Sequence, residues 1–567
     1  MDDQKIENLL NLALDATIRE REKSPDLEAG YNPLEKTWQV IIRYSGDFKE
    51  RVRPGWEFTP LSGGYGVLVL PQQDLEYLAS LPEIQYIEKP KRLFFTLDVG
   101  RAASCVSAVQ SARYNLFGRG VIVAVIDSGV DYFHPDFRKE DGSTRILELW
   151  DQEAGRIYTQ EEINRALTAG SREQGYEIVP EQDFSGHGTQ VTAIAAGNGR
   201  ASGGRYRGMA PGSDLLVVKL GMAPEDGFPR TAEVMKAVEY VIRKAEEFGK
   251  PVSVNMSFGN VYGSHRGTSL LETYLDYMAD QWKNVISVGA GNEGGTGGHA
   301  SGRVPMDESA VIELQISEFE TGLSLQIWKN YVDQYKVTVI HPNGQEAGPL
   351  GQEAGTARYR LGETELLVYY GTPSPYQGLQ EIYIEFIPGD TYLDEGTWKI
   401  LLMPQRIVDG AYNMWLSDAR VRNRGTRFLQ PTATATMTIP ATAGRVISVG
   451  AYDARRQQYA VFSGRGWPRE EFYTLPDLAA PGVEITTASP GGGYVSVTGT
   501  SFAAPFVAGA AALLMEWGIQ EGNDPFLYGE KVKSYLQRGA RQLPGFEQWP
   551  NSELGYGTLC VRDSLPV

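Results

Sequence analysis

The spacing of hydrophobic positions changes along this chain, and each spacing predicts a different kind of element. From about Gly118 to about residue 300, short continuous apolar runs alternate with amphipathic stretches. The run 121–126, bounded by Gly120 and Asp127, is typical of a strand buried on both faces of a parallel sheet. Alternation of such strands with helices predicts a doubly wound α/β fold. Further runs of this character are 215–218, 252–255, 285–288 and 446–449.

Helices are predicted between these strands. Apolar residues recur at helical spacing over 233–248, and the pattern ends at Gly249 with Pro251 just beyond, as at a helix C-terminus. The segment 189–196 is made of small residues and ends before a glycine, which indicates a helix that packs closely. The run 503–515 is small and apolar throughout, which predicts a buried helix.

Between about residues 300 and 430 the pattern changes to alternating apolar and polar positions. This period of two predicts strands with one buried face, and turn clusters such as 342–344 separate them. The α/β pattern resumes at Thr438. We therefore expect an all-β domain, a sandwich or jelly roll, inserted into the α/β domain. The predicted strands include 311–316, 323–327, 382–386 and 398–403.

The first hundred residues predict a small α+β module that ends between Phe94 and Gly100. A charged helical lead-in up to about residue 30 is followed by short strands around a short helix at 73–79. The expected strands are 40–42, 66–70 and 84–87. The predicted organisation is an α+β module (1–97), a first part of the α/β domain (98–300), the β insert (301–435) and a second part of the α/β domain (436–567).

Charge and composition exclude some classes of function. The 53 Lys and Arg against 71 Asp and Glu give a net charge of −18, which argues against nucleic acid as the main partner. We expect no membrane-spanning segment and no secretory signal peptide, hence synthesis in the cytoplasm. Cys105 and Cys560 are too few for a disulfide framework, so two inert, buried thiols in a reducing compartment are expected.

Three short motifs supply an acid, a base and a nucleophile. Asp127 follows a strand of the predicted parallel sheet, where a carboxylate can accept the Nδ1–H of a histidine. His187 lies in a Gly-His-Gly-Thr sequence whose glycines allow close backbone approach. Ser501 opens the buried helix, whose first-turn N–H groups suit a developing oxyanion. Taken singly, the aspartate could be a turn residue and the serine a helix N-cap.

A fourth motif and two backbone segments complete the predicted site. Asn292 lies in a Gly-rich turn after a strand, where its amide could act as an oxyanion donor, although alone it is equally a turn residue. Two segments follow strands and could pair with an extended peptide by strand addition. They contain the predicted substrate-binding residues, Leu220 and Gly221 in one and Ser257, Phe258 and Gly259 in the other.

With these motifs the chain resembles the subtilases, the serine proteases of the subtilisin family. The matching stretches are Asp127-Ser128-Gly129, His187-Gly188-Thr189, Gly291-Asn292 and 499–505. The resemblance implies that Asp127 orients His187, that His187 is the general base, that Ser501 is the nucleophile and that Asn292 is an oxyanion donor. It implies neither a metal nor another cofactor. It is greatest to the clostridial Csp germination proteases, which also carry an N-terminal prodomain and a jelly-roll insert.

The resemblance implies a serine endopeptidase that cleaves off its own prodomain, at a bond between Arg92 and Gly100. The expected partners are a protein or peptide substrate and the prodomain itself, bound in the cleft. In the Csp group active members cut the precursor of a spore-cortex lytic enzyme, which implies a spore-associated location. Two alternatives stay open: a prodomain-locked signalling protein that senses germinants without catalysis, and a general intracellular degradative subtilase.

Overall fold

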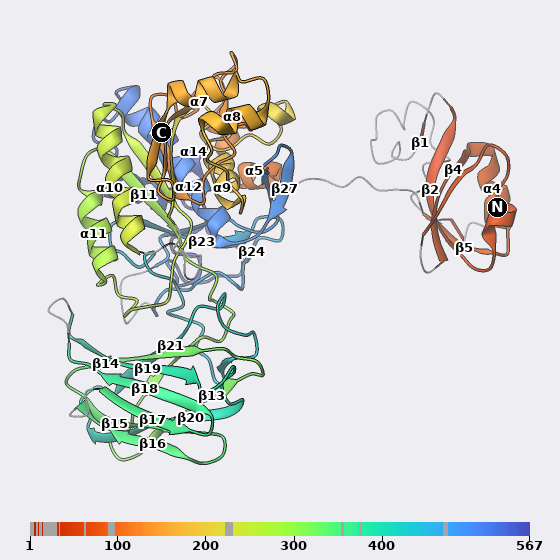
Figure 1. Ribbon diagram of the computed structural model, residues 1–567. Coiled ribbons are helices and arrows are strands. Elements are labelled where there is room, and N and C mark those ends of the chain that lie inside the picture. Colours follow the sequence, from red (N-terminus) through yellow and green to blue (C-terminus); the bar gives the residue numbers. More distant parts are fainter. Residues whose placement is uncertain are drawn as a thin grey trace. The chain divides into compact units, whose positions relative to one another are not determined.

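The computed structural model divides the chain into two units, Met1–Phe95 and Thr96–Val567 (Figure 1). Most of the predicted helical lead-in and most of the predicted processing segment lie outside the described residues. The structure describes residues 5–6, 10, 14, 31–32, 35–61, 64–88, 97–221, 229, 231–352, 356–373, 377–468 and 475–566.

In the described residues of the first unit, an antiparallel sheet is joined by the short helix α4. Its strands lie in the order β1-β2-β4-β3, and β5 pairs with β2. The pattern analysis predicted β2, β4, β5 and the helix. It missed β3, which contains Pro60; this strand lies at the sheet edge, where a residue without an N–H is tolerated. The elements are β1 (Tyr31–Asn32), β2 (Thr37–Tyr44), β3 (Glu57–Leu61), β4 (Tyr65–Pro71), α4 (Leu75–Ser80) and β5 (Ile84–Glu88).

A nine-stranded sheet organises the second unit. Its strands follow the order β24-β23-β11-β10-β6-β9-β7-β8, with β25 beside β23, and the central pairs are parallel. All five strands predicted from continuous apolar runs belong to it. The strands are β6 (Ile122–Asp127), β7 (Ile146–Asp151), β8 (Arg156–Thr159), β9 (Asp214–Lys219), β10 (Val252–Met256), β11 (Asn284–Gly289), β23 (Ile447–Asp453), β24 (Gln458–Tyr459) and β25 (Leu478–Pro481).

Helices cover both faces of this sheet, as a doubly wound fold requires (Figure 1). Successive side chains of β6 enter different cores: Val123 and Val125 pack on the side of α9 and α12, whereas Ala124 and Ile126 pack on the side of α10 and α11. All are fully buried, which explains the continuous apolar run. The helices are α9 (His187–Ala196), α10 (Thr231–Glu247), α11 (Leu270–Ala279) and α12 (Thr500–Met515).

The stretch between the aspartate and histidine motifs is more structured than its polar composition indicates. Strand β7 joins the sheet beside β9, and β8 pairs with β7 as the outermost strand. Helix α7 (Gln160–Leu167) opens with a capping box from Thr159 and Glu162, and α8 (Arg172–Ile178) is capped by Ser171. The partial exposure of β7 breaks its apolar run, which is why the pattern did not predict a strand.

Residues 299–428 form two antiparallel sheets around a separate core (Figure 1). One sheet has the order β12-β21-β14-β19-β18-β17 and the other the order β16-β15-β20-β13-β22. We call this part the β region. Its strands are β12 (His299–Arg303), β13 (Ala310–Ile316), β14 (Leu323–Asn330), β15 (Gln334–Ile340), β16 (Glu346–Leu350), β17 (Thr356–Leu361), β18 (Thr364–Tyr370), β19 (Leu379–Pro388), β20 (Gly396–Arg406), β21 (Ala411–Leu416) and β22 (Arg427–Phe428).

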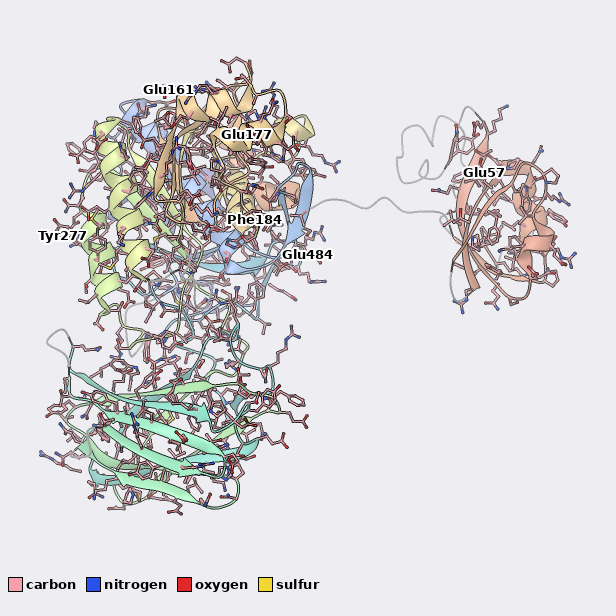
Figure 2. All side chains as sticks on the ribbon, in the orientation of Figure 1. Glu57, Glu161, Glu177, Phe184, Tyr277 and Glu484 are labelled. Carbon is pink, nitrogen blue, oxygen red and sulfur yellow. A yellow bond between two sulfur atoms is a disulfide. The ribbon has the colours of Figure 1, made fainter. Side chains whose placement is uncertain are left out.

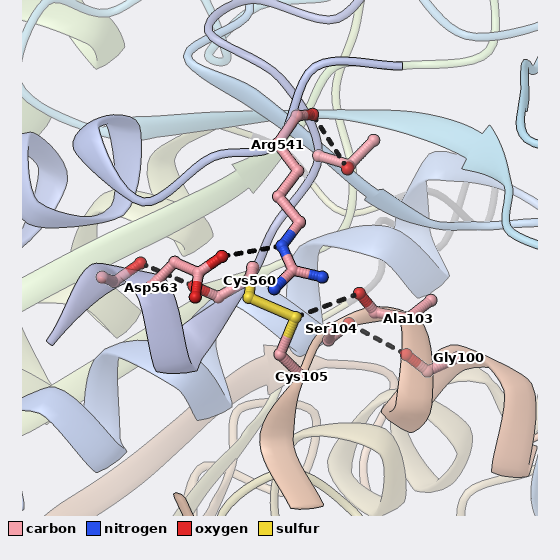
Figure 3. The surroundings of a disulfide bond; sticks show 9 residues. Gly100, Ala103, Ser104, Cys105, Arg541, Cys560 and Asp563 are labelled. Atoms are coloured by element: carbon pink, nitrogen blue, oxygen red, sulfur yellow. Dashed lines mark hydrogen bonds and ion pairs between the residues drawn. A yellow bond between two sulfur atoms is a disulfide. The ribbon is translucent and has the colours of Figure 1, made fainter. Parts of the chain in front are cut away.

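The two cysteines are joined, contrary to the expectation of two separate thiols. Cys105 and Cys560 form a disulfide with a Cα–Cα distance of 4.9 Å across 455 residues of sequence (Figure 3). The fold places the start of α6 beside the start of α14, where Val561 N–H donates to Ser104 O at 3.0 Å. Sequence spacing carries no sign of this proximity. The short elements are α5 (Leu97–Ala103), α6 (Val106–Val109), α13 (Glu530–Arg538), α14 (Val561–Ser564), β26 (Ile485–Ala488) and β27 (Tyr494–Val497).

Among the residues that the structure describes, one helical segment is long and apolar enough to cross a membrane, which the sequence analysis did not expect. It runs over Thr500–Gln520 and so contains α12. In this protein 89% of its most apolar window is buried inside the fold, where α12 contacts strands β10, β11 and β23. The segment is accordingly the central core helix of the second unit.

Candidate active site

Two of the predicted residues meet at the end of the parallel sheet. Asp127 is the last residue of β6 and His187 is the first residue of α9. Asp127 Oδ1 lies 2.7 Å from His187 Nδ1 and also accepts the N–H of Ser128 at 2.8 Å. Asp127 is 5% exposed, so the pair lies in a region of low dielectric. A buried carboxylate at Nδ1 leaves the other ring nitrogen, Nε2, as the atom that can accept a proton.

Glycines bring the aspartate and histidine loops into direct backbone contact. A Cβ atom on Gly188 would lie 2.1 Å from Gly129 O, so any other residue at position 188 would push the loops apart. Gly188 N–H donates to Ser128 Oγ at 2.9 Å. The Gly-His-Gly-Thr sequence therefore sets the distance between acid and base.

Asp183, which the sequence analysis did not single out, ties the same two loops together. Its Oδ1 accepts from Ser128 Oγ at 2.8 Å and from Gly186 N–H at 2.9 Å. Its Oδ2 accepts from the N–H and the hydroxyl of Thr189, at 2.8 and 2.7 Å. A buried carboxylate with these donors fixes the start of α9 and hence the position of His187.

The electrostatics of the pair favour the protonated, charged form of His187. Burial lowers the pKa of His187, but the charge and the hydrogen bond of Asp127 outweigh it, and the pKa is raised above its ordinary value of 6.5. Asp183 also raises this pKa, and Arg420 lowers it. The imidazolium that forms during proton transfer is thereby stabilised.

Ser501 stands in the first turn of α12, whose N-cap is Gly499. Its Oγ donates to the main-chain oxygen of Ser257 at 3.0 Å, and Ser257 Oγ donates to Ser501 O at 2.9 Å. The ring of the next residue, Phe502, lies 5.3 Å from the His187 ring, centroid to centroid. Phe502 thus connects the start of the helix to the histidine ring, while the Ser501 hydroxyl is directed at a backbone carbonyl.

Asn292 faces the same helix start from the end of β11. Its Oδ1 accepts both the N–H and the hydroxyl of Thr500, each at 3.0 Å. These bonds fix the amide so that Nδ2 is the group available to an oxygen beside Ser501. Gly291, at φ 86°, makes the approach possible, because a Cβ there would lie 2.4 Å from Thr438 Oγ1.

A cavity of about 150 Å³ opens beside the serine. Of the predicted substrate-binding residues, it includes the segment Ser257–Gly259. Three residues of the β region also line it. The lining residues are Ser257, Phe258, Gly259, Gly289, Gly291, Asn292, Glu293, Asp418, Ala419, Arg420, Thr438, Thr500 and Ser501.

Charged side chains line this small cavity. Glu293 accepts from Ala419 N–H at 3.1 Å, and burial raises its pKa. Burial also raises the pKa of Asp418, but the hydrogen bonds and charge of Arg420 outweigh it and lower the pKa overall. At neutral pH Asp418 and Arg420 therefore form an ion pair on the cavity wall.

A second, larger cavity of about 370 Å³ shares Phe258 and Gly259 with the first and also includes Asn260. Its walls are mainly apolar, and Asp418 and Arg420 again contribute. A site with a small charged cavity and a larger apolar one can accept two side chains of an extended peptide. The apolar lining residues are Pro229, Val234, Tyr262, Leu271, Val421, Ile439 and Pro440.

The other predicted substrate segment is placed differently. Leu220 is 3% exposed and packs in the core on the side of α10, and its N–H donates to Asp127 O at 2.8 Å. Gly221 N–H donates to Gln152 Oε1 at 3.0 Å. Neither residue lines the two cavities. Their role in substrate binding stays a prediction.

An exposed aromatic side chain stands beside the histidine loop. Phe184 is 86% exposed (Figure 2). The Nζ atom of Lys219 lies 5.8 Å from its ring centroid. An apolar ring exposed next to a catalytic pair offers contact area to a bound chain. The one signal in the sequence that could have indicated Phe184 as a contact residue was its position three residues before His187.

Comparison with known proteins agrees with this geometry. The model of the subtilase family matches residues 118–318 and 423–557, which is more than half of the chain. The chain belongs to the subtilase family. The model of the Csp protease B prodomain matches residues 4–91. Together the two matches assign this subtilase an N-terminal prodomain followed by a protease domain of subtilisin-like α/β fold.

Individual relatives resemble this subtilase to different extents. The minor extracellular protease Vpr of Bacillus subtilis is 23% identical over 79% of this chain and 52% of that protein. The serine protease AprX of the same species is 28% identical over 40% of this chain and 45% of that protein. The chain thus spans about half the length of these curated relatives.

A solved structure resembles this subtilase over most of its length. The Clostridium perfringens CspB protease superposes with a TM-score of 0.78 at 37% identity, covering 83% of this chain and 97% of that one. The Csp group is therefore the part of the subtilase family that this chain is most like.

Proposed function

We propose that this subtilase is a serine endopeptidase that works by acyl transfer. The observation that carries the proposal is the Asp127–His187 pair, joined at 2.7 Å, together with a cavity lined by Ser501 and Asn292. As Ser501 Oγ attacks the scissile carbonyl carbon, its proton passes to His187 Nε2. The carbonyl oxygen becomes an oxyanion between Asn292 Nδ2–H and Ser501 N–H.

The rest of the cycle uses the same groups. His187 gives its proton to the leaving amine as the C–N bond breaks, which leaves an ester on Ser501. Water then attacks the ester, with His187 again accepting a proton, and Ser501 is regenerated. The Ser501 hydroxyl must first turn from the carbonyl of Ser257 towards His187.

We propose that the first substrate is the chain itself. The prodomain match ends at residue 91 and the second unit begins at Thr96, so a cut between Arg92 and Gly100 would separate the two. The released prodomain would remain in the cleft as an inhibitor, after having assisted folding of the protease domain. A prodomain match of this extent is the support for both roles.

Intact mass of the purified wild type beside Ser501→Ala tests this proposal. Two wild-type fragments of roughly one-sixth and five-sixths of the chain, absent from the variant, are the expected result. The variant must be as soluble and as thermally stable as the wild type. Cleavage of Ser501→Ala at the same bond in a protease-free preparation would refute self-cleavage by Ser501.

A serine-reactive fluorophosphonate probe tests the catalytic site independently of processing. Labelling at Ser501 in the wild type, and none in Ser501→Ala or His187→Ala, is expected. An uncut, unlabelled wild type would instead favour the prodomain-locked signalling protein.

We propose that the physiological reaction is limited proteolysis of a protein precursor, of the spore-germination type. The proposed substrate is the precursor of a spore-cortex lytic enzyme, and the proposed location is spore-associated. The support is the similarity to the Clostridium perfringens CspB protease. Incubation with unfolded casein separates this role from general degradation. Few or no cuts are expected, whereas rapid digestion into many fragments would favour a degradative enzyme.

We also infer that the β region is a jelly-roll-like insert of the protease domain. Its first strands pair with its last ones, β13 with β20 and β14 with β19, which nests the chain as in a jelly roll. It interrupts the family match between residues 318 and 423.

A further inference from the structure

A substrate strand would pair with the main chain of the segment that continues β10 past Met256. Residues two apart in such a segment direct their carbonyl oxygens to the same side, here Ser257 O and Gly259 O. An extended peptide binds such an edge by donating its own N–H groups to these oxygens. Ser257 O lies 3.0 Å from Ser501 Oγ, the proposed nucleophile. The substrate N–H that donates to Ser257 O therefore belongs to the residue next to the scissile bond. The N–H that reaches Gly259 O then comes from two residues earlier in the peptide.

Both acceptors already have donors from the protein itself. Ser501 Oγ donates to Ser257 O, a bond that the nucleophile gives up when it turns to His187. At the second position Arg420 Nη2 donates to Gly259 O at 2.8 Å. A substrate must therefore displace a charged donor to form its second main-chain bond.

Asp418 holds the arginine in this position. Arg420 Nε lies 2.8 Å from Asp418 Oδ1, and Nη2 lies 2.8 Å from Asp418 Oδ2, a fork geometry that fixes the guanidinium plane. The side chain is 62% exposed, so it can swing away from Gly259 O into water. Asp418 and Arg420 form part of the walls of both cavities.

The arginine comes from the β region and not from the common subtilase fold. Asp418 and Arg420 follow β21, within the stretch 319–422 that the family model leaves unmatched. The β region thus reaches into the substrate edge of the protease domain. Residues shared across the family do not account for this contact.

We propose that Arg420 is a specificity-determining residue that competes with the substrate main chain for Gly259 O. The proposal rests on the proposed proteolytic function of the same site. Short peptides that offer only main-chain hydrogen bonds are disfavoured, and a substrate must make enough further contacts to displace the guanidinium. Such a threshold favours cleavage at few sites over general degradation.

A double-mutant cycle between Arg420 and one substrate N–H tests this competition. The substrate is a synthetic peptide that copies residues 88–101. A second peptide of the same sequence is N-methylated at the third residue before the cut that mass analysis locates. In the wild type N-methylation is expected to change KM less than about twofold, because the bond that the unmethylated peptide forms to Gly259 O replaces one that Arg420 gives up. In Arg420→Ala the lost hydrogen bond is expected to raise KM about five- to tenfold.

Two further variants make the comparison specific. Arg303→Ala removes another Arg–Asp pair of the β region, that with Asp409, away from both cavities; it should behave as the wild type. Arg420→Lys keeps the charge without the fork and should be intermediate. The proposal would be overturned if N-methylation changed KM by the same factor in the wild type and in Arg420→Ala, whether that factor is large or small.

Binding measurements separate failure of this inference from failure of the proposed function. The same two peptides, fluorescently labelled, are titrated into Ser501→Ala and into Ser501→Ala/Arg420→Ala, where no turnover is needed. The same pattern is expected in Kd: little effect of N-methylation with Arg420 present, and about five- to tenfold without it. An inactive wild type would refute the proteolytic function, and the Kd values would still decide the role of Arg420.

Discussion

The two sides of Ser501 are built on different principles. On the histidine side, the buried carboxylates Asp127 and Asp183 hold His187 and its loop by charge-assisted hydrogen bonds, closed by backbone contact between two loops. On the substrate side, two backbone oxygens are bonded by groups that must leave before a peptide binds, Ser501 Oγ and Arg420. Under the proposed function, the first side transfers the proton, and on the second side the substrate main chain must displace Ser501 Oγ and Arg420.

The difference shows where chemistry and selectivity reside in this fold. The proton-transfer side lies within stretches that the family model matches, so it belongs to the machinery common to subtilases. The substrate side receives Asp418 and Arg420 from the part of the β region that the family model leaves unmatched. Under the proposed function, residues outside the family match can thus change what is cut while Asp127 and His187 stay the same. Variants on the two sides should therefore affect different kinetic constants.

The largest effect is expected for Asp127→Asn, which removes the carboxylate from the histidine. The amide stabilises the wrong tautomer and no longer stabilises the imidazolium, so kcat should fall about 10⁴-fold with little change in KM. Because Asp127 raises the pKa of His187, its removal lowers that pKa. His187 then stays neutral down to a lower pH, so the acid limb of the kcat profile moves to lower pH. Peptide hydrolysis across pH measures both effects, and an unshifted acid limb would contradict the assignment.

Asn292→Ala should have the next largest effect. It removes one oxyanion donor and leaves the acid–base pair intact, so kcat should fall about 10²- to 10³-fold at nearly constant KM. The pH profile should keep the wild-type acid limb, in contrast to Asp127→Asn. Thr500→Val provides the control for orientation, because it keeps the Thr500 N–H bond to Asn292 and removes the hydroxyl bond. A loss mainly in KM would show that Asn292 binds the ground state instead.

Asp183→Asn tests whether Asp183 positions the loop that carries His187. The amide loses charge-assisted acceptors for Gly186 and Thr189, and the resulting displacement of His187 should cost about tenfold in kcat. A merely structural role would lower the melting temperature alone. Because Asp183 also raises the pKa of His187, the variant should shift the acid limb down, by less than Asp127→Asn does. Wild-type kcat and pH profile in a less stable protein would assign Asp183 to stability only.

From the sequence we predicted Asp127, His187 and the segment Ser257–Gly259, but neither Asp183 nor Arg420, and the reasons are physical. Continuous apolar runs such as 121–126 reflect burial on both sheet faces, and the motifs at Asp127, His187 and Ser501 are local in sequence. Strand β7 was missed because partial exposure breaks its pattern. The Cys105–Cys560 bond and the contact of Arg420 with Gly259 join residues far apart in sequence. Such contacts depend on the complete fold and leave no periodic signal.

The smallest expected effect links the two sides directly. Arg420 lowers the pKa of His187 through its charge, so Arg420→Ala should raise that pKa and move the acid limb up, opposite to Asp127→Asn. Arg420→Lys keeps a positive charge and should keep the limb near its wild-type position. Added salt screens an exposed guanidinium more than a buried carboxylate, so the shift should shrink at high ionic strength while that of Asp127→Asn persists. An acid limb that Arg420→Ala leaves in place would mean that the β region acts on the substrate alone, and that the proton-transfer side is electrostatically insulated from it.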